Sequence, residues 1–520
     1  MSILNVSRVS HGFGDRKIFE DISFRLLKGD HVGLIGANGE GKSTFMSIIT
    51  DKLMPDEGDI EWAARVRVGY MDQHAVLEKG MSVREALRQA FAWLYEAEAE
   101  MNGLYMQMGE AGGAALDKMM DQAADLQDLL ENSDFYMIDA RVDEVARGLG
   151  LFDLGLDTDV TELSGGQRTK ILLGKILLQT PDVLLLDEPT NFLDEEQIVW
   201  LKQYLLSYKN AFILISHDME FLNEVVNLVY HVENAGLTRY VGNYEEFLRL
   251  YEQAKRQIAA AYEKQQSEIA HLEDFIARNK ARVATANMAK SRQKKLDKMD
   301  VIELSKEKPK PEFNFTAGRT PDKLVFEAEG LIIGYEAGDP LSKPMDLLLE
   351  RGMRVALIGA NGIGKTTLLR SLLGEIPPLA GVVRTGGNQL VGYFKQEDLE
   401  GGNQSCIEHV WEAFPAYTQY EVRRALAKCG LTTQQLESRI RVLSGGEQAK
   451  VRLCKIINRE TNILVLDEPT NHLDTDAKDE LKRALQAYKG TILMVCHEPS
   501  FYMDVVNEIW DLKNNTTRIC

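Results

Sequence analysis

Apolar residues follow two patterns along this chain. Short apolar runs that end in polar residues, such as VLLLDE (183–188) and NAFILISH (210–217), have the length of buried β-strands. From residue 244 the apolar positions instead recur every three or four residues, which predicts one face of a long helix. These positions are Phe247, Tyr251, Ala254, Ile258, Tyr262, Ile269, Leu272 and Ile276. We therefore expect an α/β protein with a long helical segment near its middle.

The strand-like pattern occurs twice, together with the motifs that follow its strands. The recurring motifs are GLIGANGEGKST (33–44) with ALIGANGIGKTT (356–367), LSGGQ (163–167) with LSGGE (443–447), and LLLDEPTNFLD (184–194) with LVLDEPTNHLD (464–474). Lys42 and Lys365 are 323 residues apart, but Ser164 and Ser444 are only 280 apart, so the first copy contains 43 extra residues. A duplication with one insertion predicts two similar domains on one chain.

The duplication and the helical pattern divide the chain into three parts. We expect a first domain at 1–243 with a helical arm inserted at about 88–135, a charged helical linker at 244–311, and a second domain at 312–520. Residues 95–135 contain ten acidic residues and one lysine, which makes RNA binding by most of the arm's surface implausible. The arm's methionines are expected to fill its core; they are Met101, Met106, Met108, Met119 and Met120.

Charge is unevenly distributed. The chain carries a formal net charge of −19, yet residues 278–298 contain eight Lys or Arg and one acid, a net charge of +7. An acidic surface disfavours contact with polyanions, so any such contact must be local. No apolar run approaches the roughly 20 residues that span a bilayer, and the five cysteines form no C-x-x-C pair. We therefore expect a cytoplasmic protein with reduced thiols and no direct membrane insertion.

Two glycine-rich loops carry the first candidate chemistry. Both fit G-x-x-x-x-G-K-[ST] between an apolar strand and a helix, where backbone N–H groups surround nucleotide phosphates. The ATP-binding residues expected here are Gly36, Ala37, Asn38, Gly39, Glu40, Gly41, Lys42, Ser43 and Thr44, with Gly359, Ala360, Asn361, Gly362, Ile363, Gly364, Lys365, Thr366 and Thr367. The lysines would reach the β- and γ-phosphates, and Ser43 and Thr366 would hold Mg²⁺.

Acidic residues follow at the ends of two later strands. Asp187 and Asp467 are placed to help hold Mg²⁺, and the adjacent Glu188 and Glu468 are candidate general bases for an attacking water. The alternative is that the second acid only caps a helix. Because both copies keep Asp-Glu-Pro-Thr-Asn, catalysis is the favoured interpretation.

With these loops and acids, LSGGQ and LSGGE resemble the ATP-binding cassette (ABC) superfamily. The resemblance implies head-to-tail cassettes, with each ATP between one cassette's phosphate loop and the other's signature motif. One composite site would join Lys42, Ser43, Gln73, Asp187, Glu188 and His217 to Ser444, Gly445 and Gly446. The other would join Lys365, Thr366, Gln396, Asp467, Glu468 and His497 to Ser164, Gly165 and Gly166. Phe13 and Tyr335 stand where the family stacks an aromatic ring on adenine, although either can be a packing residue.

The two histidines have a plainer alternative, since a histidine after an apolar strand is often a satisfied core residue. The resemblance places His217 and His497 at the family's switch position, in contact with the γ-phosphate. The usual S-H-D-R reads SHDM at 216–219 and CHEP at 496–499, so Glu498 and Pro499 set the second switch apart.

Within the superfamily the chain resembles the soluble ABC-F translation factors over nearly its full length, with a pattern nearest to the YbiT-like subgroup. Both cassettes lie on one chain, the motif reads DEPTN-x-LD, and a charged linker separates the copies. The resemblance implies a monomeric pseudo-dimer that binds the ribosome. Its linker would enter the exit (E) site toward the peptidyl-site tRNA, and its arm would point to the stalk side of the large subunit.

The basic stretch would then contact rRNA and tRNA through phosphates, reading shape more than sequence. The candidate residues are Arg278, Lys280, Arg282, Lys290, Arg292, Lys294 and Lys295. The alternative is a solvated face of the hairpin, although such faces usually mix both signs of charge. The linker tip ValAlaThrAlaAsn (283–287) has no aromatic side chain, which favours housekeeping translation over protection from a ribosome-targeting antibiotic.

We therefore expect an ATP hydrolase that binds ribosomes in its ATP-closed form and leaves after hydrolysis, modulating translation or rescuing blocked ribosomes. One rival is the ATPase subunit of a separate membrane efflux transporter, which leaves the basic linker and the arm without a role. A second rival is a DNA-maintenance ATPase, for which no duplex-binding module is visible.

Overall fold

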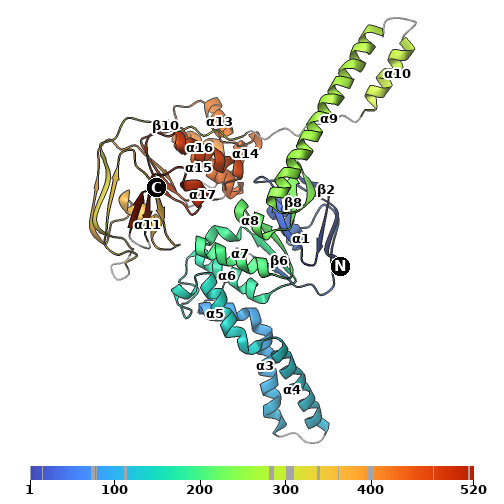
Figure 1. The fold of residues 1–520 in the computed structure, drawn as a ribbon, viewed down its shortest axis with the longest axis vertical. Helices are drawn as coiled ribbons and strands as arrows, with labels where there is room; N and C mark the ends of the chain where they lie inside the picture. Colours follow the sequence, from blue (N-terminus) through green and yellow to red (C-terminus); the bar gives the residue numbers. More distant parts are fainter. Residues whose placement is uncertain are drawn as a thin grey trace.

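A computed structural model describes residues 2–14, 16–71, 77, 79–109, 114–279, 286–299, 310–335, 340–360, 362–395, 403–471, 473–512 and 516–519. Two cassettes lie next to each other, and two helical projections leave the first cassette in opposite directions (Figure 1). The α/β architecture expected from the sequence, with tandem domains and a helical linker, is thereby confirmed.

The first cassette is built on a six-stranded sheet in the order β5-β6-β7-β3-β8-β9, in which β9 alone is antiparallel to its neighbour. Its strands are β3 (His31–Ile35), β5 (Val68–Tyr70), β6 (Val183–Asp187), β7 (Ala211–Ile215), β8 (Leu228–Glu233) and β9 (Gly236–Val241). A three-stranded antiparallel sheet, β2-β1-β4, covers one side with β1 (Ser2–Phe13), β2 (Arg16–Leu27) and β4 (Glu57–Trp62). The helices of this body are α1 (Lys42–Ile49), α2 (Val83–Arg88), α5 (Ile138–Gly148), α6 (Gly165–Gln179), α7 (Glu195–Ser207) and α8 (Met219–Val225).

The second cassette repeats this plan. Its six-stranded sheet has the equivalent order β15-β17-β18-β13-β19-β20, formed by β13 (Arg354–Ile358), β15 (Val391–Phe394), β17 (Ile463–Asp467), β18 (Thr491–Val495), β19 (Glu508–Asp511) and β20 (Thr516–Ile519). Its antiparallel sheet consists of β11 (Leu324–Ile332), β12 (Met345–Glu350) and β14 (Ala380–Thr385). Its helices are α11 (Lys365–Leu372), α12 (Cys406–Ala413), α13 (Gln419–Lys428), α14 (Thr433–Glu437), α15 (Gly445–Ile457), α16 (Thr475–Ala487) and α17 (Pro499–Tyr502). Short 3-10 turns are η1 (Gln89–Phe91), η2 (Phe135–Met137), η3 (Phe152–Leu154), η4 (Pro189–Phe192) and η5 (Ile440–Val442).

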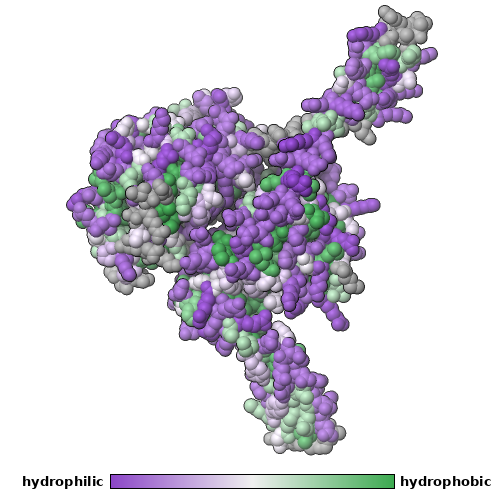
Figure 2. All heavy atoms as spheres, in the orientation of Figure 1, coloured by the Kyte–Doolittle hydropathy of each residue, from purple (hydrophilic) through white to green (hydrophobic). Residues whose placement is uncertain are grey.

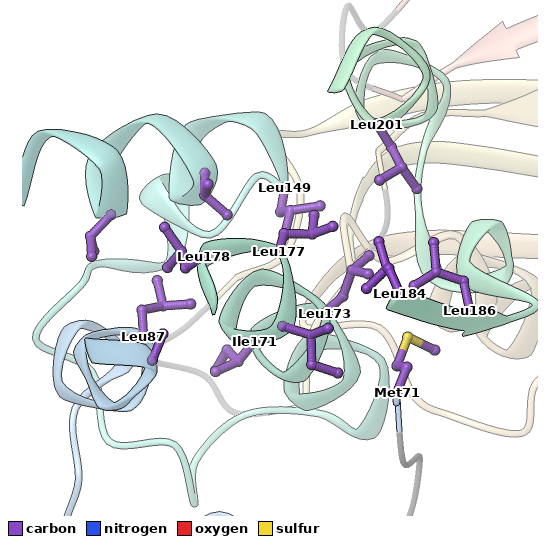
Figure 3. Close-up of a cluster of buried hydrophobic side chains, with 14 of the residues drawn as sticks. Met71, Leu87, Leu149, Ile171, Leu173, Leu177, Leu178, Leu184, Leu186 and Leu201 are labelled. Atoms are coloured by element: carbon purple, nitrogen blue, oxygen red, sulfur yellow. The ribbon is translucent and has the colours of Figure 1, made fainter. Parts of the chain in front are cut away.

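The apolar strands are explained by the two hydrophobic cores that they separate. Side chains of β6 alternate between them: Leu184 and Leu186 belong to the core under α6, whereas Val183 and Leu185 belong to the core under the antiparallel sheet. A parallel strand covered on both faces needs apolar residues at every position, which is why VLLLD reads as an unbroken run. Figure 3 shows the core under α6, where Leu173 lies toward Leu184 and Leu186 and Ile171 lies toward Leu87.

The inserted segment forms the predicted arm, a pair of helices that projects from the first cassette (Figure 1). The helices are α3 (Ala92–Met108) and α4 (Ala114–Asn132). Met101, midway along α3, is buried, but Met106 is 82% exposed and Met120 is 55% exposed. The expectation that the arm's methionines fill its core is therefore wrong for these two, because two helices alone cannot bury both of their faces.

The linker forms the second projection, a hairpin of α9 (Tyr244–Asn279) and α10 (Ala286–Asp297). Phe247 is buried on the first cassette among His231, Tyr240 and Tyr251. At the other end Phe313 is fully buried in the core of the second cassette, and β10 (Thr316–Ala317) pairs with β16 (Glu460–Thr461). Each end of the linker is thus anchored on a different cassette.

Candidate active sites

The first phosphate-binding loop connects β3 to α1. Gly41 precedes α1 with a φ of 107°, and Gly36 has a φ of 155° with its Cα so close to β8 that a Cβ would lie 2.5 Å from the carbonyl oxygen of Val232. The Lys42 amine donates hydrogen bonds to the carbonyl oxygens of Gly36, at 2.7 Å, and Ala37, at 3.2 Å. The loop therefore closes around its own lysine at a helix N-terminus, the arrangement that binds phosphate.

The second loop, between β13 and α11, has the same geometry. The Lys365 amine donates to the carbonyl oxygens of Gly359 and Ala360, both at 2.8 Å, and Gly364 precedes α11 with a φ of 99°. The remaining predicted loop residues lie in the loops or in the first turns of the helices; they are Asn38, Gly39, Glu40, Ser43, Thr44, Gly362, Ile363, Thr366 and Thr367. Asn361 lies outside the described residues.

The two aromatic candidates are exposed, and one of them, Tyr335, contacts the helix that follows the second loop. Tyr335 is 65% exposed, and its hydroxyl accepts a hydrogen bond from Thr367 at 3.2 Å. Phe13 is 54% exposed and contacts the ring of His11 edge-on, with ring centroids 4.9 Å apart. Stacking on a nucleotide base stays a prediction for both residues.

The predicted magnesium-binding residues converge on the phosphate loops. Asp187 ends β6, where its carboxylate accepts a hydrogen bond from the Ser43 hydroxyl. Burial raises the pKa of Asp187 and outweighs the Ser43 hydrogen bond and the Lys42 charge, which act to lower it. Asp467 ends β17 and is fully buried. A hydroxyl and a carboxylate beside a lysine suit the hard oxygen coordination of Mg²⁺ bound to phosphates, so these residues fit the expected cofactor.

Each candidate general base lies against its switch histidine. His217 Nε2 is 3.4 Å from Glu188 Oε1, and the His217 backbone N–H donates to Glu188 Oε2 at 3.2 Å. His497 Nε2 is 3.4 Å from Glu468 Oε1. Both glutamates have a φ of 49°, a left-handed conformation that side chains rarely adopt and that is common at functional sites. The structure brings together the catalytic residues paired from the sequence, whereas Gln73 and Gln396 lie outside the described residues.

The two glutamates differ in their electrostatic surroundings. Burial and the neighbouring Asp187 carboxylate raise the pKa of Glu188 to about 7, against the opposing charge of Lys42. Burial acts in the same direction on Glu468, but the hydrogen bond and charge of His497 and the charge of Lys365 outweigh it and lower the pKa of Glu468. The side-chain amide of Asn471 also donates to the Glu468 carboxylate.

The signature serines begin helices. Ser164 precedes α6 and accepts a hydrogen bond from the Gln167 N–H at 3.3 Å, while Ser444 precedes α15 and accepts from the Glu447 N–H at 3.4 Å. In each case the side chain of the third helical residue accepts from the serine N–H, which completes a capping box. The first turns of these helices contain the signature glycines Gly165, Gly166, Gly445 and Gly446. Their N–H groups have no partner within the helix and point outward from its N-terminus.

Motifs of the two cassettes face each other. A Cβ on Gly362 of the second phosphate loop would lie 3.9 Å from Nε2 of Gln167 in the first signature motif. A second approach between the cassettes involves Asp474, which ends the DEPTNHLD motif. Burial lowers the pKa of Lys42, and the charge of Asp474 is one of those that oppose this shift. The charge of His217 in the first cassette acts in turn to lower the pKa of Asp474. Opposed motifs of this kind can enclose a ligand between the cassettes.

Residues that sequence reasoning missed connect the signature helices to these sites. Asp474, the N-cap of α16, accepts a hydrogen bond from the buried Lys450 amine at 2.8 Å, and in the first cassette Lys170 donates to Gln197 at 2.7 Å. The repeated DEPTN-x-LD motif ends in Asp194 and Asp474, so its last residue was the available signal.

The basic hairpin is hydrophilic over most of its visible surface (Figure 2). Several of its cations have partners on α9: Arg278 pairs with Asp274 at 2.9 Å, Lys295 pairs with Glu268 at 2.7 Å, and the Arg292 guanidinium lies 3.6 Å from the centroid of Phe275. Lys290 and Lys294 are exposed. Lys280 and Arg282 lie outside the described residues.

Within the described part of the chain, no helix is long and apolar enough to cross a membrane.

Comparison with known proteins reports the same architecture. Residues 19–191 and 342–471 match the family model described as ABC transporter, and a second model with that description matches residues 230–315. Two solved structures show the same fold at 18% identity: archaeal ribosome recycling factor aABCE1 in complex with the ribosomal stalk protein aP1, with a TM-score of 0.56, and RNase-L Inhibitor, with a TM-score of 0.55. Each likeness covers 97% of this chain and 87% of the other.

Relatives in sequence extend over nearly the whole chain. The uncharacterized ABC transporter ATP-binding protein YfmM of Bacillus subtilis is 65% identical to this chain, and the match covers 100% of both sequences. ABC transporter F family member 2 of Arabidopsis thaliana is 33% identical, over 98% of this chain and 76% of its own length. Probable ATP-binding protein YbiT of Escherichia coli O157:H7 is 33% identical, over 97% of this chain and 95% of its own. The chain therefore belongs to the ATP-binding cassette family and is an ATPase of its ABC-F group.

Proposed function

We propose that this ABC-F ATPase binds the ribosome while two ATP molecules join its cassettes, and that it leaves after hydrolysis. The observation that carries the proposal is the basic stretch of residues 278–298, with a net charge of +7, which belongs to the projecting hairpin of α9 and α10 in a chain with a net charge of −19. Placing cations on a projection lets them approach RNA phosphates while the acidic cassettes stay farther away.

Each composite site would divide its tasks between the two cassettes. The phosphate loop with Lys42 or Lys365 would bind the ATP phosphates, and the opposing signature serine would contact the γ-phosphate. Ser43 and Asp187, or Thr366 and Asp467, would hold Mg²⁺, which would neutralise part of the phosphate charge when bound. Glu188 or Glu468 would take the proton of the attacking water, and His217 or His497 would hold that carboxylate in place.

The resemblance to ABC-F translation factors assigns the proposed ribosomal contacts to the two projections. The linker would occupy the exit site with its tip toward the peptidyl-site tRNA, and Lys290, Lys294 and the other hairpin cations would contact rRNA and tRNA phosphates. The acidic arm would extend toward the stalk side of the large subunit. The structural neighbours include a ribosome-bound archaeal Pelota and ABCE1 model at 19% identity, which is a likeness of fold.

A sedimentation experiment tests the proposal. The Glu188→Gln/Glu468→Gln variant should retain ATP binding, lose turnover by at least about 100-fold because it lacks both general bases, and co-sediment with ribosomes through sucrose in ATP but not in ADP. In the same background, replacing the hairpin cations with Gln should abolish co-sedimentation. The hairpin positions are Arg278, Lys280, Arg282, Lys290, Arg292, Lys294 and Lys295.

A matched control removes the same charge elsewhere. Its seven Gln substitutions are at exposed cassette positions, namely Lys28, Arg65, Lys79, Lys209, Arg239, Lys343 and Lys489. This control should still co-sediment. Equal loss of co-sedimentation in both Gln variants would mean that net charge, not the position of the cations, determines binding. If the Glu188→Gln/Glu468→Gln protein binds ATP but remains at the top of the gradient, ribosome binding is contradicted.

A further inference from the structure

One ion pair is present in the second cassette and has no equivalent in the first. The Lys478 amine lies 2.8 Å and 3.1 Å from the two carboxylate oxygens of Glu498, and the lysine side chain is only 15% exposed. At the repeat interval of 280 residues, the first cassette has Ile198 and Asp218 instead. Asp218 uses its carboxylate differently, accepting a hydrogen bond from the Phe221 N–H at 2.9 Å as the N-cap of α8.

The unusual CHEP sequence explains why Glu498 is available for this pair. Pro499 occupies the first turn of α17 and has no N–H, and the Glu498 side chain makes no capping hydrogen bond. The carboxylate instead reaches α16. Because Glu498 directly follows His497, the ion pair holds the backbone next to the switch histidine, whose Nε2 is 3.4 Å from Glu468.

The other end of the pair leads to the signature helix. Lys478 lies in the first turn of α16, where its N–H donates to the Asp474 carbonyl oxygen at 2.9 Å. The Asp474 carboxylate accepts from Lys450 on α15, the helix that Ser444 caps. Short contacts therefore connect the catalytic pair of the second cassette to its signature motif, which serves the other composite site. In the first cassette this connection is interrupted at Ile198.

The pair also lies at the junction of the cassettes, where α17 and α8 come near each other in Figure 1. The charges of Lys478 and Glu498 act on Asp218 in opposite directions, and the charge of Lys478 opposes the raised pKa of Glu188. The charge of Lys478 thus acts on Asp218 and Glu188 in the first cassette, while its amine is hydrogen-bonded to Glu498 in the second.

We propose that Lys478 is a positioning residue that, through Glu498, holds His497 against Glu468 and ties this pair to the signature helix of the same cassette. The proposal rests on the two-site ATPase above and makes the second switch depend on α16, whereas the first switch is held without such a pair.

Single-site variants separate this role from general stability. In Glu188→Gln protein only the site of Glu468 turns over, and there Lys478→Leu should lower kcat about tenfold through misplacement of the histidine, with the KM for ATP changed less than about twofold. In Glu468→Gln protein, where only the site of Glu188 turns over, the same substitution should change kcat by less than about twofold, since the first switch has its own contact, the His217 N–H donating to Glu188 at 3.2 Å. Lys478→Arg should restore most of the activity, and adding Glu498→Gln to Lys478→Leu should cost little more.

A matched control comes from an ion pair on the equivalent helix of the first cassette. Lys202 of α7 pairs with Glu224, and its side chain is 26% exposed. Lys482, at the same repeat position in the second cassette, does not serve as a control because its amine also donates to the Ser500 carbonyl oxygen at 2.7 Å, in the segment next to the switch histidine. Lys202→Leu should leave kcat in both backgrounds near its starting value. Equal losses for Lys478→Leu in both backgrounds, or losses equal to those of Lys202→Leu, would overturn the positioning role.

Hydrogen exchange gives a readout that needs neither turnover nor ribosomes. Lys478→Leu should speed exchange at residues 496–503 and leave residues 216–223 unchanged. Unchanged exchange at 496–503 would overturn the proposal. A protein that bound ATP but hydrolysed none would instead refute the proposed ATPase, and the exchange result would still decide the role of Lys478.

Discussion

The two cassettes share a backbone plan, and their active sites hold the same residue types in different electrostatic surroundings. Their sheets have the same strand order, and the pairing registers agree: Val183 lies opposite Ala211, as Ile463 lies opposite Thr491 at the same spacing. Yet the pKa of Glu188 is raised to about 7 and that of Glu468 is lowered. At Glu188 burial and the Asp187 charge prevail, whereas at Glu468 the side-chain hydrogen bonds from His497 and Asn471 and the charges of His497 and Lys365 outweigh burial.

The cassettes also differ in how the linker holds them. The first is followed directly by α9, whereas residues 310–317 carry the chain into the second cassette, where β10 pairs with β16. There the Phe313 N–H donates to Glu480 at 2.8 Å, and Arg483 donates to the Phe313 carbonyl oxygen at 3.0 Å. At the position of Glu480 the first cassette has Trp200, which packs against Gly148 and Tyr204. A duplicated surface has thus been used for different contacts.

The largest stability effect is expected where this segment enters the second cassette. Phe313 is fully buried, so Phe313→Ala should destabilise the second cassette by about 3–5 kcal/mol through lost burial and a cavity. Peptide-resolved hydrogen exchange in urea measures each cassette separately. As a control, Phe152→Ala in the first cassette, at a side chain 42% exposed, should cost less than about 1 kcal/mol. An equal loss of protection in both cassettes would mean that they unfold as one unit.

A pair of equivalent lysines should differ in their cost. Lys450→Met leaves Asp474 without the amine that is 2.8 Å away, in a pair with side chains 10% and 18% exposed, and should cost about 3 kcal/mol. Lys170→Met leaves only the neutral amide of Gln197, which also donates to Asp194 at 2.7 Å, and should cost about 1–2 kcal/mol. The measurement is the urea dependence of exchange in α15 and α6. Equal costs would show that the charge of Asp474 is relieved by water or by the first cassette.

The sequence predicts the repeated domains, the arm and the linker of this structure, but it does not predict contacts between side chains on separate elements. The register of the duplication predicted both cassettes, the arm and the linker, because each depends on local pattern and spacing. The pairing of Glu188 with His217 came from the resemblance, and the distances agree with it. The Lys478–Glu498 pair and the docking of Phe313 involve residues 20 and 167 positions from their partners on separate elements, and no periodicity encodes such contacts.

The smallest expected effect concerns a feature that both cassettes share. Ser82 caps α2 and Ser405 caps α12, each in a capping box with the glutamate three residues later, at 3.2 Å in both cases. Ser82→Ala and Ser405→Ala should each cost about 1 kcal/mol, and the two costs should be equal within error because the caps have the same geometry and exposure. Exchange in α2 and α12 under urea measures them side by side.

The same two capping boxes predict how the stability cost of each alanine substitution changes with pH. Hydrogen bonds from the serine N–H and hydroxyl lower the pKa of Glu85 and of Glu408. A carboxyl whose pKa is lowered on folding stabilises the fold above its unfolded pKa and loses that contribution as the pH falls through its folded pKa. Because the hydroxyl is part of this interaction, the difference between wild type and each alanine variant should shrink on acidification, in parallel for the two cassettes. A difference that shrank in only one of them would mean that these two capping boxes, despite their equal geometry, are not equivalent in solution.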